Sequence, residues 1–151
     1  MLLSHLLTPQ RIRVPLLAAD KQAALHALVD AAAEGNEVAA DDLFAAIEER
    51  EAVLSTGIGH GVAIPHGRSG QVGSLLVSAG IVPTPIEFGS LDGLPVRLLF
   101  LLVGPESEAG LHVKVLSRIT RLVRQPLVRE RLLAATNGEE FHRVLREAEG
   151  L

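Results

Sequence analysis

Two histidines in the sequence occupy positions that favour chemistry. His66 follows Pro65 at the end of a short predicted strand and precedes Gly67, so its ring leaves rigid backbone toward a glycine-lined space. A fixed, partly desolvated imidazole can act as a nucleophile or a general base. His112 falls in the first turn of a predicted helix, where unpaired N–H groups and the positive dipole end bind anions and favour neutral imidazole. A core histidine would give the same pattern at His112, so both interpretations stay open.

The other histidines give weaker signals. His5, His26 and His142 lie on ordinary helical or terminal stretches, and we expect them to be surface or half-buried residues. His60 could join His66 and His112 as the third ligand of an all-imidazole zinc site, but no carboxylate motif accompanies them. The sequence has no cysteine, which excludes a thiolate site and a cysteine nucleophile. We therefore expect neither a bound metal nor a cofactor.

The segment STGIGHGVAIPHG (55–67) is rich in glycine, which predicts a loop that leads into a short strand at 62–64. Its Gly57-x-Gly59 pattern has a faint likeness to a dinucleotide-binding turn. That fingerprint follows a strand and opens a helix, whereas this loop follows a helix and runs into Pro65, so we reject the dinucleotide interpretation. Glycines alone favour a tight connection over a site, although they let backbone approach a ligand closely.

Helical periodicity predicts the elements around this loop. A helix over 21–34 has Asp20 as its N-cap and Gly35 as its stop, and a second helix over 41–50 places Arg50 near its C-terminus. Three more helices are predicted over 111–124, from Pro126 to Ala134 or Ala135, and over 138–149 with Asn137 as cap. The outward face of the 111–124 helix carries basic residues, which we expect to be solvated surface rather than a docking patch: Lys114, Arg118, Arg121 and Arg124.

Apolar runs at 75–82 and 96–103 predict central strands that are covered on both faces, and 86–88 predicts a third short strand. Helices, then strands, then helices describe an α/β fold with a mixed sheet. The 151 residues fit one domain. The apolar runs are too short for a membrane span, and the N-terminus lacks a signal-peptide pattern, so we expect a cytoplasmic protein.

The charge and aromatic content narrow the expected partners. Eighteen acidic residues against fourteen basic ones give a formal net charge of −4, which argues against a general nucleic-acid or anionic-membrane surface. Aromatic residues make up only 3% of the chain, so platforms for stacking bases or sugars are scarce. We expect small molecules or other proteins as partners.

Two segments, AAIEEREAVLSTGIGHGVAIPHGR and HVKVLSRITRLV, resemble the signatures of a known family. It is the fructose/mannitol-type enzyme IIA domain of the bacterial phosphoenolpyruvate-dependent phosphotransferase system, including its nitrogen-regulatory branch. LLTPQRI and ADKQAALHALVDAAA are similar to the family's N-terminal strand and first helix, so the resemblance spans nearly the whole chain. The sequence departs at Val113, where Leu is usual, and at His60, where nitrogen-type members often carry Asn. The extra imidazole lies close enough in sequence to touch the site.

The resemblance implies a three-layer α/β/α sandwich with a small mixed β-sheet and one phosphoryl-carrier domain over residues 1–151. It places the phosphoryl acceptor at His66, the arginine of the site at Arg50 and the second histidine at His112. In that arrangement Arg50 meets two phosphoryl oxygens with its planar fork, His112 donates to another, and amides of the glycine loop complete the cradle. The implied donor is a histidine phosphocarrier protein such as HPr, and the implied acceptor is an enzyme IIB or a regulatory target protein.

The function implied is therefore that of a phosphotransferase-system enzyme IIA component, in sugar transport or in nitrogen regulation. The motif STGIG in a free-standing chain favours the regulatory branch. One alternative is a non-phosphorylated regulatory protein-binding module on the same fold, against which His66, Arg50 and His112 together argue. Another is a metal-dependent hydrolase, which co-purifying zinc would reveal. In the systems of this family, the fructose- and mannitol-type enzyme IIB receives its phosphate on a cysteine. We therefore expect no such domain in this cysteine-free chain.

Overall fold

A six-stranded mixed sheet forms the middle layer of the computed structural model, which describes residues 2–150. The strands are β1 (Ile12–Arg13), β2 (Gly57–Gly59), β3 (Val62–Ala63), β4 (His66–Arg68), β5 (Leu76–Ile86) and β6 (Val96–Gly104). Their order is β1-β5-β6-β3-β2, and β4 pairs with β6 further along, beyond the end of β3. The central strands β5 and β6 are antiparallel, and so are β2 and β3, while β1 runs parallel to β5, and β3 and β4 run parallel to β6. The predicted mixed sheet is confirmed.

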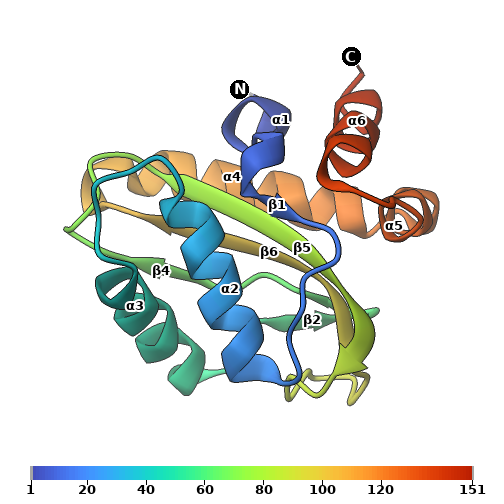
Figure 1. Cartoon of the computed structure of the whole chain (residues 1–151), viewed down its shortest axis with the longest axis horizontal. Coiled ribbons are helices and arrows are strands. Elements are labelled where there is room, and N and C mark those ends of the chain that lie inside the picture. The colour runs from blue at the N-terminus through green and yellow to red at the C-terminus, as the bar shows by residue number, and fades with distance from the viewer. Residues whose placement is uncertain (1, 151) are drawn as a thin grey trace.

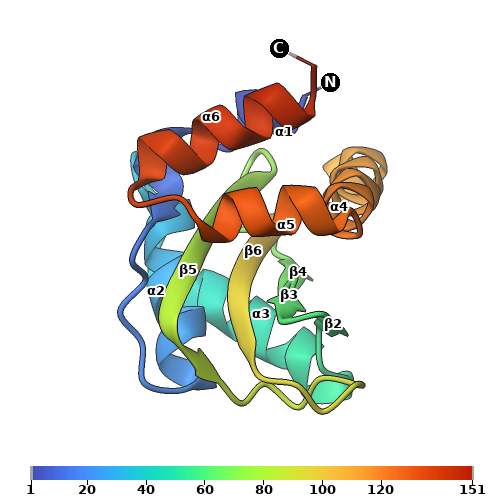
Figure 2. The same cartoon turned by 90° about the vertical axis from the view of Figure 1, so that its right-hand side faces the viewer.

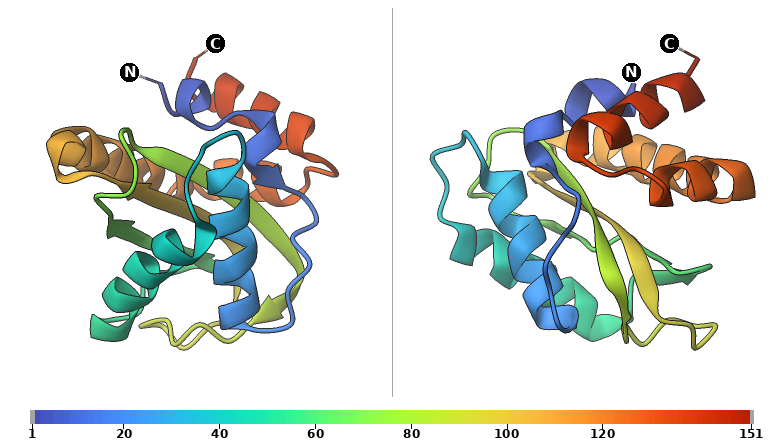
Figure 3. Two further views of the ribbon diagram at one scale, coloured as in Figure 1. Left: turned by 60° about the vertical axis from the view of Figure 1, so that its left-hand side comes forward. Right: turned by 45° about the vertical axis from the view of Figure 1, so that its right-hand side comes forward.

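Helices cover both faces of this sheet (Figures 1 and 3). They are α1 (Leu3–Leu6), α2 (Lys21–Ala33), α3 (Ala40–Val53), α4 (Ala109–Val123), α5 (Pro126–Leu133) and α6 (Gly138–Ala148), with short 3-10 helices η1 (Pro9–Arg11) and η2 (Glu106–Glu108). One face carries α2 and α3, and the other carries α1, α4, α5 and α6. The three-layer α/β/α arrangement is the one that the sequence implied.

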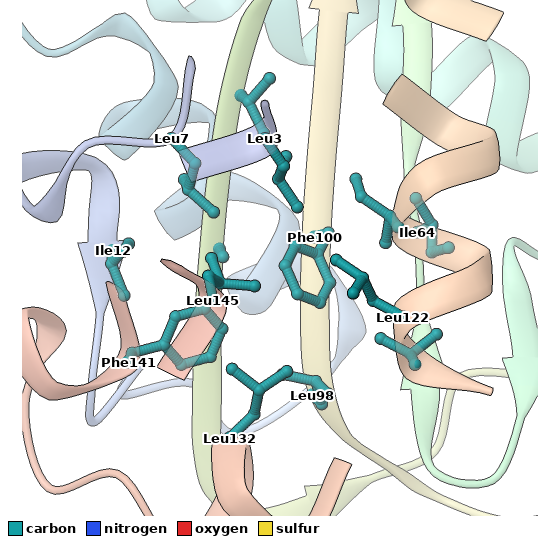
Figure 4. Packing of buried hydrophobic residues seen from close by; sticks show 14 of the residues in the cluster. Leu3, Leu7, Ile12, Ile64, Leu98, Phe100, Leu122, Leu132, Phe141 and Leu145 are labelled. Carbon is teal, nitrogen blue, oxygen red and sulfur yellow. The ribbon is translucent and has the colours of Figure 1, made fainter. Parts of the chain in front are cut away.

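Each face of the sheet has its own hydrophobic core, because successive strand residues point to opposite sides. On β6, Leu98, Phe100 and Leu102 pack toward α4, α5 and α6, whereas the alternate residues of the strand pack toward α2 and α3. Figure 4 shows the first cluster, in which the rings of Phe100 and Phe141 lie with their centroids 5.9 Å apart. Both central strands are thus buried on two sides, as their continuous apolar runs predicted.

The predicted helix caps are present. The Asp20 side chain accepts a hydrogen bond from the backbone N–H of Ala23 at 2.8 Å, and Asn137 does the same for Glu140 at 2.8 Å. The predicted helix boundaries hold to within one residue except at two ends: α3 continues past Arg50 to Val53, and α4 begins two residues before 111. Arg50 lies in the last turn of α3, near the C-terminus of the helix as predicted.

Two strand predictions were incomplete or wrong. The glycine-rich segment contains β2 and β4 as well as β3, and its turn lies at His60, whose φ is +58°. A separate strand at 86–88 does not exist, because β5 itself runs through Ile86 with a register irregularity after Ile81. The two prolines in that stretch are exposed and lie at the irregularity. A strand tolerates proline there, although proline lacks the backbone N–H donor.

The first and last helices meet at one buried carboxylate. Glu149 accepts hydrogen bonds from the backbone N–H groups of Leu3 and Ser4, at 2.8 and 2.9 Å, and Arg118 of α4 reaches the same carboxylate at 3.3 Å. Neither α1 nor this contact was expected from the sequence. None of the helices formed by residues 2–150 combines the length and the apolar character needed to cross a membrane.

Candidate functional site

A pocket of about 540 Å³ opens where β4 lies between α3 and α4. Figure 2 shows β4 next to β6, with α4 on one side and α3 on the other. The pocket is lined by Ala46, Glu49, Arg50, Val53, His66, Gly67, Arg68, His112, Val113 and Leu116. The structure therefore brings together the three residues on which the sequence prediction rested.

Gly67 lets β4 lie directly against α3. A Cβ atom at this position would stand 2.8 Å from the backbone oxygen of Ala46, a distance that real Cβ contacts do not reach. On the other side β4 is fixed to the sheet, where Pro65 accepts a hydrogen bond from Leu102 at 3.0 Å and His66 pairs with Leu102 in register. The backbone that carries His66 is thus held from two directions.

A backbone hydrogen bond orients the His66 ring. Nδ1 of His66 lies 2.8 Å from the carbonyl oxygen of Ile64. Since a carbonyl can only accept, Nδ1 carries the proton and the lone pair of the neutral ring is on Nε2. Burial lowers the pKa of His66 below its ordinary value, and the positive charge of Arg50 lowers it further, against an opposing effect of the Ile64 bond. His66 is therefore neutral near pH 7, with Nε2 as its nucleophilic atom.

His112 faces His66 from α4. Only 3% of its surface is exposed, and the centroids of the two imidazole rings are 5.6 Å apart. Burial, followed by the charges of Arg68 and His66, lowers the pKa of His112 to about 4. Its Nδ1 has no hydrogen-bond partner among residues 2–150. His112 is therefore buried near the start of α4, which agrees with both interpretations of this residue. It also lines the pocket.

Arg50 presents its guanidinium group from the last turn of α3. Nη1 donates a hydrogen bond to the carbonyl oxygen of Leu54 at 2.8 Å, which satisfies one of the free carbonyls that follow the helix. An arginine has five N–H donors in a planar fork, so most of them stay available to an anion in the pocket. The half-buried side chain is thus oriented without being neutralised by a carboxylate among the described residues.

Glu51, the residue after Arg50, fixes the end of α3. This buried carboxylate accepts hydrogen bonds from the N–H and hydroxyl of Thr56, at 2.9 and 2.6 Å, and pairs with Lys21 at 2.8 Å. The Lys21 ammonium also lies over the ring of Phe88, 4.5 Å from its centroid. The network ties α2, α3 and the start of the glycine-rich segment together, and so sets the position of Arg50. The prediction from sequence did not include Glu51.

Arg68 is a second arginine at the pocket that the sequence prediction missed. It follows His66 by two residues on β4, and alternate residues of a strand point to the same side. In the sequence the only signal was its place in the segment IPHGR, because no strand was expected there. Its Nη1 lies 3.8 Å from the carboxylate of Glu106 in η2, directly before α4.

His60 does not belong to the pocket, contrary to the expectation that it could touch the site. It is exposed at the turn between β2 and β3, where its backbone N–H donates to the carboxylate of Asp92 at 3.0 Å. Because β3 and β4 continue along β6 past the turn, closeness in sequence does not bring His60 near His66. Within residues 2–150, no three His, Asp or Glu side chains gather closely enough to hold a metal ion.

Most of the glycine-rich segment lies outside the pocket. A side chain at Gly57 would clash with Ser90, and one at Gly59 would come close to Asp92, so these glycines serve close packing against the 89–94 loop. Neither of them lines the pocket, and of the segment's glycines only Gly67 does. The expectation that amides of this segment contact an anion stays a prediction, and Gly67 is the glycine to which it can apply.

Comparison with known proteins agrees with the fold. Residues 5–148 match the family described as "Phosphoenolpyruvate-dependent sugar phosphotransferase system, EIIA 2". A nitrogen regulatory protein of Bradyrhizobium diazoefficiens is 34% identical over 143 residues, covering 95% of this chain and 94% of that protein. The fructose-specific EIIA component of Haloferax volcanii is 33% identical over 132 residues, covering 85% and 84%.

The solved structures include a close match in shape. The crystal structure of nitrogen regulatory protein IIA-Ntr from Neisseria meningitidis superimposes with a TM-score of 0.88 at 30% identity, covering 94% of this chain and 97% of that one. Family match, relatives and fold agree with one another over nearly the full length of the chain. The chain belongs to the EIIA 2 family of the phosphoenolpyruvate-dependent sugar phosphotransferase system.

Proposed function

We propose that this EIIA-type protein accepts a phosphoryl group on Nε2 of His66 from a histidine phosphocarrier protein of the HPr type. It then passes the group to an enzyme IIB or uses it to change the binding of a regulatory target. The observation that carries this proposal is the 2.8 Å hydrogen bond between Nδ1 of His66 and the carbonyl of Ile64, which leaves Nε2 as the lone pair in the pocket. We also propose that residues 1–151 act as one carrier domain in the cytoplasm.

The transfer steps need no proton to enter or leave the His66 ring. As Nε2 attacks, its bond to phosphorus forms while the phosphorus–nitrogen bond of the donor breaks, and the donor imidazole leaves with that electron pair. The proton stays on Nδ1, which donates it to the Ile64 carbonyl in a hydrogen bond throughout, and the ring bears the positive charge. In the next step the acceptor attacks phosphorus, the bond to Nε2 breaks, and His66 returns to its neutral form.

Arg50 and His112 are proposed to stabilise the phosphoryl group during its transfer. Charge spreads over three oxygens in such a transfer, so catalysis depends on positioned donors and positive charge. Arg50 offers the planar fork that meets two oxygens at once, and a neutral His112 offers an N–H. A lowered pKa at His112 keeps the ring neutral, so the pocket binds phosphate less tightly than it would with a third full positive charge.

The rim of the pocket supports transfer between docked proteins. Val53 and Val113 line the pocket and are large apolar residues that are exposed. Exposed apolar residues beside the charged groups of a pocket occur at protein contact surfaces. They are consistent with a donor and an acceptor that each bring a side chain to His66, and we propose that both partners dock here.

The regulatory branch is the better supported of the two roles. The relative from Bradyrhizobium diazoefficiens and the Neisseria meningitidis structure are both named as nitrogen regulatory proteins. A phosphoryl group adds roughly −1.5 to −2 charges at the docking surface, enough to change which partner binds. Sugar transport, the role named for the Haloferax volcanii relative, is the second candidate.

Phosphotransfer from labelled phosphoenolpyruvate through enzyme I and a histidine phosphocarrier protein tests the proposal. The wild-type chain should take up acid-labile label, and His66→Ala should take up none. His5→Ala, at an exposed histidine outside the pocket, is the matched control and should be labelled normally. Label that persists in His66→Ala would overturn the assignment of the acceptor.

A further inference from the structure

We propose that Arg68 is a second phosphoryl-binding arginine and that Glu106 holds it in the unphosphorylated protein. This inference rests on the proposed phosphorylation of His66. It assigns a role to a residue for which neither the resemblance nor the sequence motifs provided one.

Charge spreads over the three oxygens of a transferring phosphoryl group, so positioned donors and positive charge stabilise the transfer. Arg50 approaches from α3 and His112 from α4. Further donors were expected from the glycine loop, but Gly57 and Gly59 pack against the 89–94 loop outside the pocket. Arg50 and His112 can reach the three oxygens, and each oxygen can accept another hydrogen bond, so a further charged donor can bind the same group.

Arg68 is placed to be such a donor. It lines the pocket and stands two residues beyond His66 on the same strand, so the two Cα atoms are about 6.6 Å apart and the side chains share a face. An arginine side chain can span that separation. The pocket contains one carboxylate, Glu49, and its other charged lining residues are Arg50 and Arg68.

The contact between Arg68 and Glu106 is weak enough to be exchanged. Their nearest atoms are 3.8 Å apart, and 37% of the Arg68 side chain and 85% of the Glu106 side chain are exposed. Exposed ion pairs of this kind contribute little, whereas a guanidinium group binds a phosphoryl group through short, paired, charge-assisted hydrogen bonds. A phosphoryl group on His66 should therefore draw Arg68 away from Glu106.

The exchange also connects the phosphorylated site to the start of α4. Glu106 belongs to η2, which leads directly into the helix that carries His112 and Val113. When Arg68 turns to the phosphoryl group, Glu106 becomes an unpaired carboxylate at the edge of the docking rim. A partner could thus distinguish the two forms by the charge of this edge as well as by the phosphoryl group.

The chain offers a matched control for both residues. Arg13 and Glu34 form an ion pair of the same length, 3.8 Å, with 36% and 61% of their side chains exposed, and neither residue lines the pocket. Substitutions at this pair make the same change in net charge as those at Arg68 and Glu106. Any difference between the two sets therefore reports position and not overall charge.

The experiment compares Arg68→Gln, Arg68→Lys and Glu106→Gln with Arg13→Gln and Glu34→Gln in the labelled phosphotransfer assay. We expect Arg68→Gln to slow labelling of His66 by about tenfold, since one charged donor is lost, and Arg68→Lys to lie between it and wild type. Glu106→Gln should shift the equilibrium toward the phosphorylated chain by about threefold, because it removes the competitor. The control pair should match wild type.

A second readout follows the phosphoryl group itself. In phosphorus-31 NMR of the phosphorylated chain, the titration midpoint of the phosphoryl group should lie higher in Arg68→Gln than in wild type or Arg13→Gln, since a neighbouring guanidinium favours the dianion. Equal labelling rates and equal midpoints for Arg68→Gln and Arg13→Gln would overturn the inference while leaving phosphorylation of His66 intact. Wild-type protein that takes up no label on His66 would overturn both.

Discussion

The imidazole rings of His66 and His112 stand edge to face, with their planes at 68° and their centroids 5.6 Å apart. They come from β4 and α4, elements separated by the whole central hairpin of the sheet. Burial is the main cause that lowers the pKa of each ring, and the nearby positive charges act in the same direction. The folded protein therefore keeps two neutral imidazoles beside two arginines.

Acid should destabilise the protein through His112. Its pKa falls from 6.5 to about 4 on folding, so the unfolded chain takes up the proton at the higher pH. The stabilisation is complete above about pH 6.5 and is lost as the pH falls toward 4, since the unfolded state binds more protons there. Urea unfolding of wild type and His112→Asn across this range measures it. An equally steep loss of stability in the variant would show that other groups are responsible.

Arg50→Ala should transfer phosphate about 100-fold more slowly than wild type, because a preorganised charged donor is missing. Arg50→Lys should recover only part of the rate, since an ammonium group cannot form the planar paired contact. Arg129→Ala is the control. Arg129 also donates to a carbonyl at a helix C-terminus, that of Val123 at 2.7 Å, but lies outside the pocket. Both alanine variants should lose a similar, small stability of about 1 kcal/mol. Slow transfer in Arg129→Ala would mean that the effect comes from the helix end.

Gly67→Ala should destabilise the fold and distort the pocket. The added Cβ would meet the Ala46 carbonyl at 2.8 Å, so β4 must move away from α3, at a cost of about 1–3 kcal/mol. Gly70→Ala adds the same group where nothing lies within 4 Å, and should change stability by less than about 0.5 kcal/mol. Urea midpoints and labelling rates of both variants give the comparison. Normal labelling of a stable Gly67→Ala protein would contradict the close packing of β4 on α3.

Glu51→Gln should reduce stability by about 2 kcal/mol, because Lys21 and Thr56 lose a buried charged acceptor. It should also slow phosphotransfer, since the last turn of α3 positions Arg50. Glu48→Gln removes an exposed carboxylate from the same helix and should affect neither property. Equilibrium unfolding and the labelling assay separate the two effects, and a stable Glu51→Gln protein would refute the anchoring role of the network.

Much of the fold was predictable because its signals are local. Asp20 and Asn137 cap helices by contacts within three residues, and the continuous apolar runs of β5 and β6 reflect burial on both faces. The short strands β2 and β4 were not predictable in this way. They are defined by pairing with β3 and β6, and three residues carry no periodicity of their own.

The residues of the candidate site also differ in whether a local signal in the sequence identifies them. His66, Arg50 and His112 could be selected through residue type and family motif, and they do share a pocket. His60 was misplaced because the strands that follow its turn carry the chain along β6, so that His66 lies away from the turn despite its closeness in sequence. Arg68 and Glu51 were missed because their importance lies in contacts with elements distant in sequence, η2 for one and α2 for the other.

The carboxylate of Glu149, which binds the N–H groups of Leu3 and Ser4, brings the beginning and the end of the described chain within one side chain of each other. Both lie on the opposite side of the sheet from α3 and apart from the pocket (Figure 1). The fold is thus suited to circular permutation: a short linker from α6 to α1, with new ends in the exposed stretch at 34–37, would leave β4, α3 and α4 in their present positions. The order of the elements along the chain could change while the site stayed the same.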